Sequence, residues 1–595
     1  MELIPLVAGP LRMVFDPQLA FLRYVCCDGI EVIRGIYVAV RDQAWNTIPF
    51  EVSDLRVEDQ HGSFSLGWTA RCTSDEVAFE WRNVVAGSNQ GTLGYRFDGE
   101  AKSSFLRNRI GICLLHPAHE CAGQPCRVEH ADGTETDGTF PLWIAPHQPF
   151  KNIRSIKHAV RQGRDLRVEF EGDAFEMEDQ RNWTDTSFKT YSTPLERPYP
   201  VRLHEGDRVR QTVTVEVLDG ESVVDGNADA IRLRSTHREL ADEDVRIRVD
   251  WDVFRTLPQV GLSTAHSAVG EPCAAVTSLL KEARPDHLRV DLHLASDIWR
   301  DHLRNASRLA EQIDAQLELV IFCDSIEAAA WPDCLAALAA QRRRTARWLV
   351  LPESAKATPG ELAFDASKEL RAIDSQIPIV FGTDRNFAEL NRNRPAMPTS
   401  ALVCYSIHPQ MHASDNASLC ETIEGQAATV QSAHEYFRTE VVISPITLRP
   451  RYKSAATVGM DHFNDRELPA DDRQSTGFLA AWTVGTLSRL AVQPKLASIT
   501  LYETHGPRGI VDLLGVPYPT HSVFRAMREY QSACATTSSE PLAVVGLGMT
   551  GANGRRGILV GNMSSQRRRV VTQTASGTAL LGVIEPEAVK HITDC

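Results

Sequence analysis

The chain has 595 residues, of which 43% are hydrophobic and 24% are charged, and it carries a formal net charge of −14 at pH 7. A chain this long has room for about two to four domains, each with a hydrophobic core. The negative balance argues against nucleic acid or an anionic membrane surface as the main partner, because both need basic patches.

The cellular location follows from signals that the sequence lacks. No apolar run approaches the ~20 residues that cross a bilayer. The N-terminal stretch has no basic region and carries Glu2, which is untypical of a secretory signal. The 13 cysteines are odd in number and follow no framework, as expected for reduced thiols. We therefore expect a cytoplasmic protein that spans no membrane.

The first 245 residues carry β signals. Segments such as 30–40 (IEVIRGIYVAV) and 209–217 (VRQTVTVEV) are rich in β-branched residues and alternate in polarity. Long helical periodicity is hard to find between them. The pattern predicts a large N-terminal β-sandwich domain over residues 1–245.

From residue 246 the pattern changes to short apolar strands that alternate with amphipathic helices. About eight such units in roughly 250 residues predict a (β/α)8 TIM barrel. We therefore expect a multidomain α/β plus all-β protein with a barrel domain at 246–535. Strands are expected at 260–263, 288–293, 317–324, 378–384, 401–408, 440–444 and 498–503, with a further one ending just before Glu353. Helices are expected at 296–315, up to 340, at 418–437, 477–490 and 520–532.

After residue 535 the β signals return, which predicts a small C-terminal β domain at 536–595. Within it Gly546, Gly548 and Gly551 match G-x-G-x-x-G, the fingerprint of a dinucleotide-binding fold. That fold also needs a following helix and an acidic residue about 20 positions on. A second glycine-rich turn and a strand follow instead, so a β-hairpin is the preferred interpretation.

The stretch 347–355, RWLVLPESA, indicates how the barrel is used. A buried strand is cut off by Pro352, and Glu353 follows at the carboxyl end of the strand, where barrel enzymes carry their catalytic groups. Other strand ends supply polar residues to the same rim. They are His266, Asp291, His293, Asp324, Asp384, Asn386, Tyr405, His408, His412, Arg449 and Glu503. Each has an alternative explanation, because polar residues are common where strands meet water, and Arg289 and Asp291 could pair inside the barrel.

Two carboxylates at such a rim suggest general acid and base catalysis. We expect Glu353 and Glu503 to be that pair, with His408 assisting. The remaining rim residues chosen as substrate-binding are Asp291, Asp384, Asn386, Tyr405, His412 and Arg449. Arg449, Asn386 or His412 could stabilise an oxyanion. No G-x-S-x-G elbow is present, so water is the expected nucleophile.

A glycoside hydrolase that acts on apiose-containing or related sugars is the alternative function. Glu353 occupies the position of the acid in barrel glycosidases, at the end of the fourth strand. The seventh strand end, SPITLRPR, has no carboxylate, and Glu503 lies one strand further on. A retaining mechanism needs carboxyl groups about 5 to 5.5 Å apart. Because strands four and eight face each other across a barrel, that mechanism is disfavoured.

Metal binding would use some of the same residues. His408 and His412 with Asp384 or Glu503 could form a mixed site, and so could His116, His119 and Cys121 in the first domain. Neither set follows a standard spacing such as H-E-x-x-H. We therefore expect no metal and no cofactor, and interpret these histidines as sugar-contacting or loop-bracing groups.

Several long stretches resemble one enzyme family, the D-apionate lactonases of bacterial apiose catabolism. They are 107–117 (RNRIGICLLHP), 140–150 (FPLWIAPHQPF), 175–195 (FEMEDQRNWTDTSFKTYSTPL), 406–424 (SIHPQMHASDNASLCETIE), 444–451 (SPITLRPR) and 501–509 (LYETHGPRG). The resemblance implies a β-rich N-terminal domain, a barrel, and a hydrolase that opens a small-molecule sugar lactone such as D-apionolactone to D-apionate. It carries over no catalytic residues.

The stretch 175–195 gains an interpretation from this resemblance. Trp183 and Lys189 are expected to bind substrate, since the stretch mixes polar groups with an aromatic ring, as sugar-binding loops do. The alternative is an ordinary loop with Trp183 packed in an interface. A third hypothesis, besides the two enzymes, is a carbohydrate-binding protein that has the barrel fold but no catalytic activity.

Overall fold

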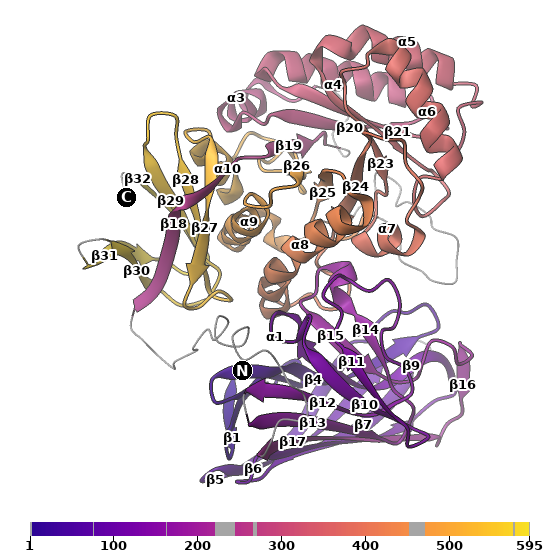
Figure 1. Ribbon diagram of the computed structural model, residues 1–595, viewed down its shortest axis with the longest axis vertical. Coiled ribbons are helices and arrows are strands. Elements are labelled where there is room, and N and C mark those ends of the chain that lie inside the picture. Colours follow the sequence, from indigo (N-terminus) through magenta and orange to yellow (C-terminus); the bar gives the residue numbers. More distant parts are fainter. Residues whose placement is uncertain are drawn as a thin grey trace. The chain divides into compact units, whose positions relative to one another are not determined.

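A computed structural model describes residues 3–74, 77–161, 163–219, 244–265, 271–451, 470–574 and 577–593. These residues divide into two compact units. The first takes in residues up to 181 and from 186 to 219, and the second takes in 182–185 and the described residues from 244 onward. Figure 1 shows β-sheet throughout the first unit and helices around the barrel strands in the second.

The first unit consists of two antiparallel sheets. The eight-stranded sheet contains, in order, β1 (Ile4–Ala8), β2 (Leu11–Asp16), β3 (Phe21–Cys27), β4 (Ile30–Asp42), β9 (Phe105–Pro117), β15 (Ser187–Tyr191) and β14 (Glu176–Asp179), with β16 (Val201–Leu203) beside β9. The nine-stranded sheet contains β11 (Glu135–Thr139), β10 (Pro125–His130), β12 (Ile153–Arg161), β13 (Arg164–Glu171), β17 (Arg208–Asp219), β8 (Thr92–Ala101), β7 (Ala78–Gly87), β6 (Ser63–Thr73) and β5 (Phe50–Gln60).

The two sheets pack face to face over one hydrophobic core, which confirms the predicted β-rich first domain. Alternation along the strands produces this packing, because every second side chain of β6 is buried. Phe15 of β2 and Trp68 of β6 meet in the core with ring centroids 4.8 Å apart. The short helix α1 (Ala118–Cys121) follows β9 directly.

The second unit contains a closed barrel of eight parallel strands, as predicted. They are β19 (Gln259–Ser263), β20 (His287–His293), β21 (Gln316–Phe322), β22 (Thr345–Leu351), β23 (Ile379–Gly382), β24 (Leu402–Ile407), β25 (Val441–Ile446) and β26 (Leu496–Glu503). The helices are α3 (Ala274–Ala283), α4 (Trp299–Ile313), α5 (Trp331–Gln341), α6 (Gly360–Ile373), α7 (Phe387–Asn393), α8 (Asn416–Phe437), α9 (Gly477–Leu490) and α10 (Pro519–Met527).

Helix–strand packing follows from helical periodicity. In α4 the residues Leu303, Ala306, Leu309 and Ile313 are buried at spacings of three and four, so they share one helix face. The long helix α8 begins at a capping residue, because the side chain of Asp415 accepts a hydrogen bond from the backbone nitrogen of Ser418.

The barrel interior contains both apolar and polar side chains. On β21 to β25 the buried residues Val320, Phe322, Leu349, Val380 and Val442 belong to one apolar cluster. On β20 the alternate residues 289, 291 and 293 are Arg, Asp and His instead. A polar layer formed by Arg289, Glu318, Arg347 and Ser444 crosses the barrel below the mouth.

A seven-stranded sheet completes the second unit. It runs β31 (Gly577–Ile584), β30 (Arg568–Thr574), β18 (Asp244–Thr256), β27 (Ser532–Ser538), β28 (Val544–Thr550), β29 (Arg556–Asn562) and β32 (Ala588–Thr593). The predicted boundary between residues 245 and 246 falls inside β18. The glycine run 546–551 lies on β28, which pairs antiparallel with β29. It therefore belongs to a β-hairpin, as the sequence favoured.

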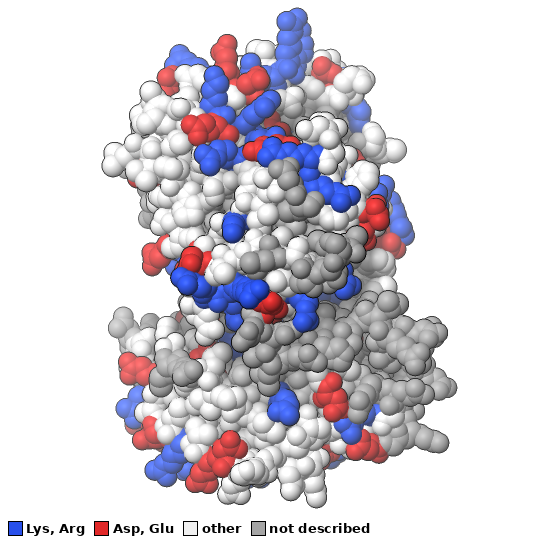
Figure 2. All heavy atoms as spheres, turned by 90° about the vertical axis from the view of Figure 1, so that its left-hand side faces the viewer, with Lys and Arg blue, Asp and Glu red and all other residues white. Residues whose placement is uncertain are grey.

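The surface carries mixed charge. Figure 2 shows positive and negative side chains intermingled on the face it draws. Surface ion pairs include Arg300 with Asp333 and Arg308 with Glu271. Among the described helices, none combines the length and the hydrophobicity needed to cross a membrane.

Candidate active site

A bridge of four charged side chains crosses the barrel mouth. Arg289 donates from Nε to Asp291 Oδ1 at 2.8 Å and from Nη2 to Asp384 Oδ1 at 2.6 Å. Arg451, from the segment after β25, donates to both of the same carboxylates, at 3.0 Å to Asp384 Oδ1. Burial lowers the pKa of each arginine, but the two carboxylates outweigh it and the net shift is upward. The bridge is thus two positive charges balanced by two negative ones.

A histidine–carboxylate pair lies at the ends of the second and fourth barrel strands. His293 Nδ1 is 3.0 Å from Glu353 Oε1 and 3.2 Å from Oε2. The imidazole stacks on Phe322, with ring centroids 4.2 Å apart and an interplanar angle of 9°. Asp324 Oδ1 accepts hydrogen bonds at 3.0 Å from the backbone nitrogens of Glu353 and Ser354, which fixes the turn that carries Glu353.

The pair is suited to proton transfer. Burial lowers the pKa of His293, but the hydrogen bond that it donates to Glu353 and the negative charges of Asp291 and Glu353 raise it more, so the net shift is upward. Because Nδ1 must carry a proton to donate to the carboxylate, Nε2 of the neutral ring is left as the acceptor. Both side chains retain access to solvent, with 34% of His293 and 24% of Glu353 exposed.

Glu503 faces the mouth because of an irregularity in β26. Leu262 pairs with Leu501 and Ser263 with Glu503, so Tyr502 is the extra residue of a bulge. Tyr502 has a φ of 47°, in the left-handed region. Its hydroxyl bonds to Thr483 of α9 at 2.8 Å, outside the barrel, whereas Thr500 bonds to Glu318 inside it. The bulge therefore reverses the alternation and turns Glu503 inward.

A small pocket of about 20 Å³ lies beside Glu503. Its lining includes three arginines, each with a carboxylate partner: Arg449 with Asp471, Arg451 with the bridge, and Arg508 with Glu503 at 2.8 Å. The remaining lining residues are Ser263, Thr447, Leu448, Pro450, Gln474 and Tyr502. Arg451 lies in this lining and also contacts Asp291, which is two residues before His293 on β20.

Comparison with known proteins identifies the family. The family model described as "D-apionate lactonase, N-terminal domain" matches residues 2–220, and the one described as "D-apionate lactonase, TIM barrel domain" matches residues 260–532. The chain belongs to the D-apionate lactonase family. A curated D-apionate lactonase of Brucella anthropi is 28% identical over 528 residues, which cover 83% of this chain and 82% of the relative. Family membership makes the chain a hydrolase of the lactonase class.

Solved structures with a similar barrel are more distant. A GH51 arabinofuranosidase from Xanthomonas axonopodis pv. citri is 13% identical with a TM-score of 0.40, covering 59% of this chain and 95% of its own. A beta-arabinopyranosidase is 10% identical with a TM-score of 0.31, covering 99% of this chain and 98% of its own. Likenesses of this size carry no conclusion about function.

Five of the site residues predicted for this lactonase family member lie at the barrel mouth. They are Asp291, Glu353, Asp384, Arg449 and Glu503. The structure gives Asp291 and Asp384 buried arginine partners, the pairing that the sequence had left open for Asp291. His266 lies outside the described residues.

Tyr405 and Lys189 lie elsewhere. Tyr405 is fully buried, and its hydroxyl bonds to Thr429 of α8 at 2.7 Å, on the outer side of the barrel wall. Lys189 pairs with Glu178 at 2.6 Å within the β14–β15 hairpin of the first unit. The hydroxyl of Tyr405 therefore points away from the barrel interior, and the ion pair of Lys189 lies within the first unit.

His408 is fully buried behind the mouth. Its Nδ1 bonds to Thr447 Oγ1 at 2.8 Å, and Thr447 lines the pocket. Burial lowers the pKa of His408 to about 3, so the ring is neutral at pH 7 and a weak base. This geometry favours a role in positioning Thr447 over a role in proton transfer.

His412 follows β24, Asn386 precedes α7, and Trp183 lies between β14 and β15 in the sequence. His412 Nδ1 bonds to Asp185 Oδ2 at 2.6 Å, and its ring meets Trp183 edge-on, with centroids 5.3 Å apart. The guanidinium of Arg392 lies 4.8 Å from the Trp183 ring centroid. Asn386 is 1% exposed and directly precedes α7.

The sequence arguments placed His293 at the rim without assigning it a role, and they did not select Arg451 or Arg508. Two signals were available. Residues 287, 289, 291 and 293 are polar at alternate positions of β20, and Arg451 follows Arg449 by two in the loop after β25. Arg508 gave no local signal, because its contact with Glu503 depends on how the loop after β26 folds back.

Proposed function

We propose that this chain hydrolyses D-apionolactone to D-apionate at the barrel mouth. The observation that carries the proposal is the combination, in a member of the D-apionate lactonase family, of a proton-transfer pair with three guanidiniums at one mouth. A lactone needs such a set: a base for water, donors for the oxyanion, and an acid for the departing ring oxygen.

In the proposed reaction His293 acts first as base and then as acid. Neutral Nε2 takes a proton from water as its oxygen bonds to the lactone carbonyl carbon. The tetrahedral intermediate then collapses, the bond from the carbonyl carbon to the ring oxygen breaks, and the imidazolium returns the proton to that oxygen. Glu353 holds the Nδ1 proton and stabilises the imidazolium, which is the role a carboxylate plays beside a catalytic histidine.

Arginines stabilise the negative charge in this scheme. Arg449 is 44% exposed and lines the pocket, so it is the guanidinium best placed to meet the carbonyl oxygen as it becomes an oxyanion. Glu503, ion-paired with Arg508, accepts hydrogen bonds from the hydroxyl groups of the sugar acid. The carboxylates of Asp291 and Asp384 hold Arg451 in place, and His408 holds Thr447.

The experiment is acid release from D-apionolactone by the purified protein, followed in a pH-stat against spontaneous hydrolysis. Release far above background is expected and is lost in Glu353→Gln. If Glu503→Gln abolishes release and Glu353→Gln does not, the base belongs in the pocket instead. Failure on a panel of aldonolactones, with release of sugar from apiosides, would overturn the proposal. That outcome is not expected, because β22 and β26 are four strands apart in the closed ring of eight, opposite positions unsuited to a retaining pair.

A further inference from the structure

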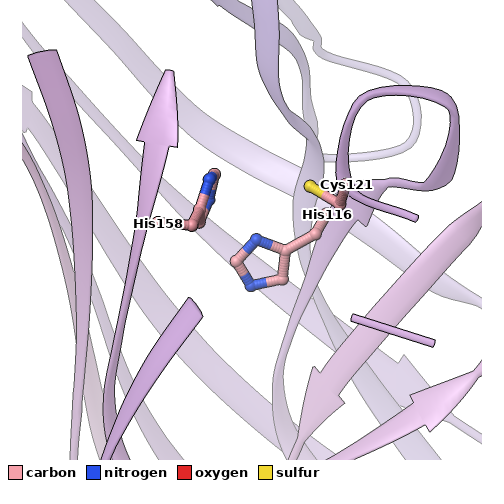
Figure 3. Close-up of side chains that lie close together, drawn as sticks. All are labelled: His116, Cys121 and His158. Carbon is pink, nitrogen blue, oxygen red and sulfur yellow. The ribbon is translucent and has the colours of Figure 1, made fainter. Parts of the chain in front are cut away.

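Three side chains of the first unit converge in its interior, two from neighbouring positions in the sequence and one from a distant strand. His116 lies at the end of β9, Cys121 at the end of α1, and His158 in β12. A ring nitrogen of each histidine and the sulfur of the cysteine all lie within 4.8 Å of one another. Figure 3 shows the thiol and the two rings turned toward a common point. None of the three belongs to the barrel site.

The polar atoms of this cluster lack the partners that burial demands. His116 is 0% exposed, and neither of its ring nitrogens has a hydrogen-bond partner among the residues that the structure describes. His158 is 5% exposed, and its Nε2 also has none, whereas its Nδ1 contacts the carbonyl of Ala159 at 3.3 Å. A buried polar group without a partner is costly, and about nine in ten such groups have one.

Packing alone does not explain the choice of residues. Phe140 contacts both imidazoles, with centroids 5.6 Å away in each case, so the cluster is continuous with an aromatic core. A phenylalanine would fill such a position without the cost of unpaired nitrogens. Two imidazoles that face a thiol are, in contrast, the ligand types that soft and borderline transition metals prefer.

We propose that His116, Cys121 and His158 bind a structural zinc ion. Zinc bonds of about 2.0–2.1 Å to nitrogen and 2.3 Å to sulfur need only a modest contraction from the present separations. Cys126 is the nearest candidate for a fourth ligand, because it pairs directly with His158 in the β10–β12 ladder and so projects from the same face. Hard cations such as calcium are excluded, since the three side chains offer no oxygen.

The protonation of the cluster agrees with this assignment. Burial lowers the pKa of His116 and of His158, so both rings are neutral, which is the form that binds metal. Burial raises the pKa of the Cys121 thiol, which stays protonated until a metal replaces the proton. Zinc binding is therefore expected to release one proton per chain.

The position of the cluster suggests what the ion would do. β9 belongs to the eight-stranded sheet and β12 to the nine-stranded sheet, so the ion would link the two sheets of the sandwich. The sequence had suggested His119 as the third ligand, but it lies beside Glu31, Glu120 and Arg34 instead. His158 replaces it from a strand about 40 residues away, where no local spacing could reveal it.

The test measures zinc binding to the full-length protein. Metal-free protein is titrated with zinc against a competing chromophoric chelator, and cobalt is then used as a spectroscopic probe. We expect one zinc ion per chain and a cobalt–thiolate charge-transfer band. Cys121→Ser and His158→Gln should each weaken zinc binding by about 100-fold or more and abolish the band, since even outer-shell changes cost about 10- to 100-fold.

Matched controls separate this site from other thiols and imidazoles. His119→Gln changes a neighbouring histidine, and Cys72→Ser changes a buried thiol of the same sandwich, and both should bind zinc as wild type does. The proposal is overturned if wild-type protein binds no zinc, or if Cys121→Ser binds it equally well. If a ligand variant does not fold, the unfolding temperature of the wild-type protein provides the test. Chelation should lower that temperature, and added zinc should restore it.

Discussion

At the scale of single residues, the contact between His293 and Glu353 carries the proposed chemistry. Replacing Glu353 by Gln keeps the shape but removes the charge that stabilises an imidazolium. We expect kcat for lactone opening to fall by about 10²- to 10⁴-fold, the range typical of general acid–base groups. Glu361→Gln, an exposed change in the first turn of α6, is the matched control and should leave kcat unchanged. Equal activity of the two variants would remove Glu353 from the mechanism.

The same contact predicts the pH dependence. As a base in the free enzyme His293 must be neutral, so kcat/KM should rise with pH through the pKa of His293. Its net pKa shift is upward, which places this limb above the ordinary value of about 6.5. Removing the charge of Glu353 should move the limb of the residual activity to lower pH. A limb that stays in place in Glu353→Gln would show that another group titrates.

The sequence could predict which strand ends carry polar residues, but not which of those residues pair. Glu353 and Glu503 were chosen as candidates because they lie at or just after the end of a recognisable strand. Asp384 was predicted as a substrate ligand, yet its partners Arg289 and Arg451 come from positions 95 residues before it and 67 after it. Such contacts depend on barrel closure, which has no local signature.

At the scale of elements, the bulge at Tyr502 determines the direction of Glu503. Thr483 donates its hydroxyl proton to the carbonyl of Leu479, so Tyr502 must be the donor to Thr483. We expect Tyr502→Phe to lower the free energy of unfolding by about 1 kcal/mol. The test is a double-mutant cycle with Thr483→Val, in which urea denaturation and activity are measured for each variant. The coupling energy between the two side chains should be of similar size. A coupling near zero would mean that the hydroxyl does not hold the bulge.

The barrel elements were predictable because each is specified by local periodicity. All eight predicted strands overlap observed ones, and the predicted helix at 477–490 coincides with α9. The bulge in β26 was not predictable, since SITLYE reads as a plain strand. Its irregularity depends on Tyr502 finding Thr483 on the neighbouring helix.

At the scale of the whole molecule, the C-terminal sheet joins distant parts of the chain. β18, from before the barrel, lies between β27 and β30, from after it. A sequence pattern can at most indicate that β18 is a strand. It does not show which sheet the strand joins. A domain boundary drawn where the periodicity changes therefore cuts through this sheet.

This arrangement predicts a specific clash. A Cβ atom added at Gly548 of β28 would lie 2.4 Å from Val249 Cγ1 of β18. We expect Gly548→Ala to lower the unfolding free energy by about 1–3 kcal/mol, as overpacked cores do. Gly94→Ala, where the added atom meets nothing within 4 Å, is the control. Adding Val249→Ala should restore part of the loss, and no restoration would contradict the placement of β18.

The charge balance of the pocket has a consequence for turnover. Lactone hydrolysis converts a neutral molecule into an anion, and a pocket of three unpaired arginines would hold that product tightly. Here Arg449, Arg451 and Arg508 each share their charge with a carboxylate of the protein. The anion must therefore compete with Asp471, Asp291, Asp384 or Glu503 for every guanidinium it approaches. We therefore expect the pocket to bind the anionic product weakly and to release it readily.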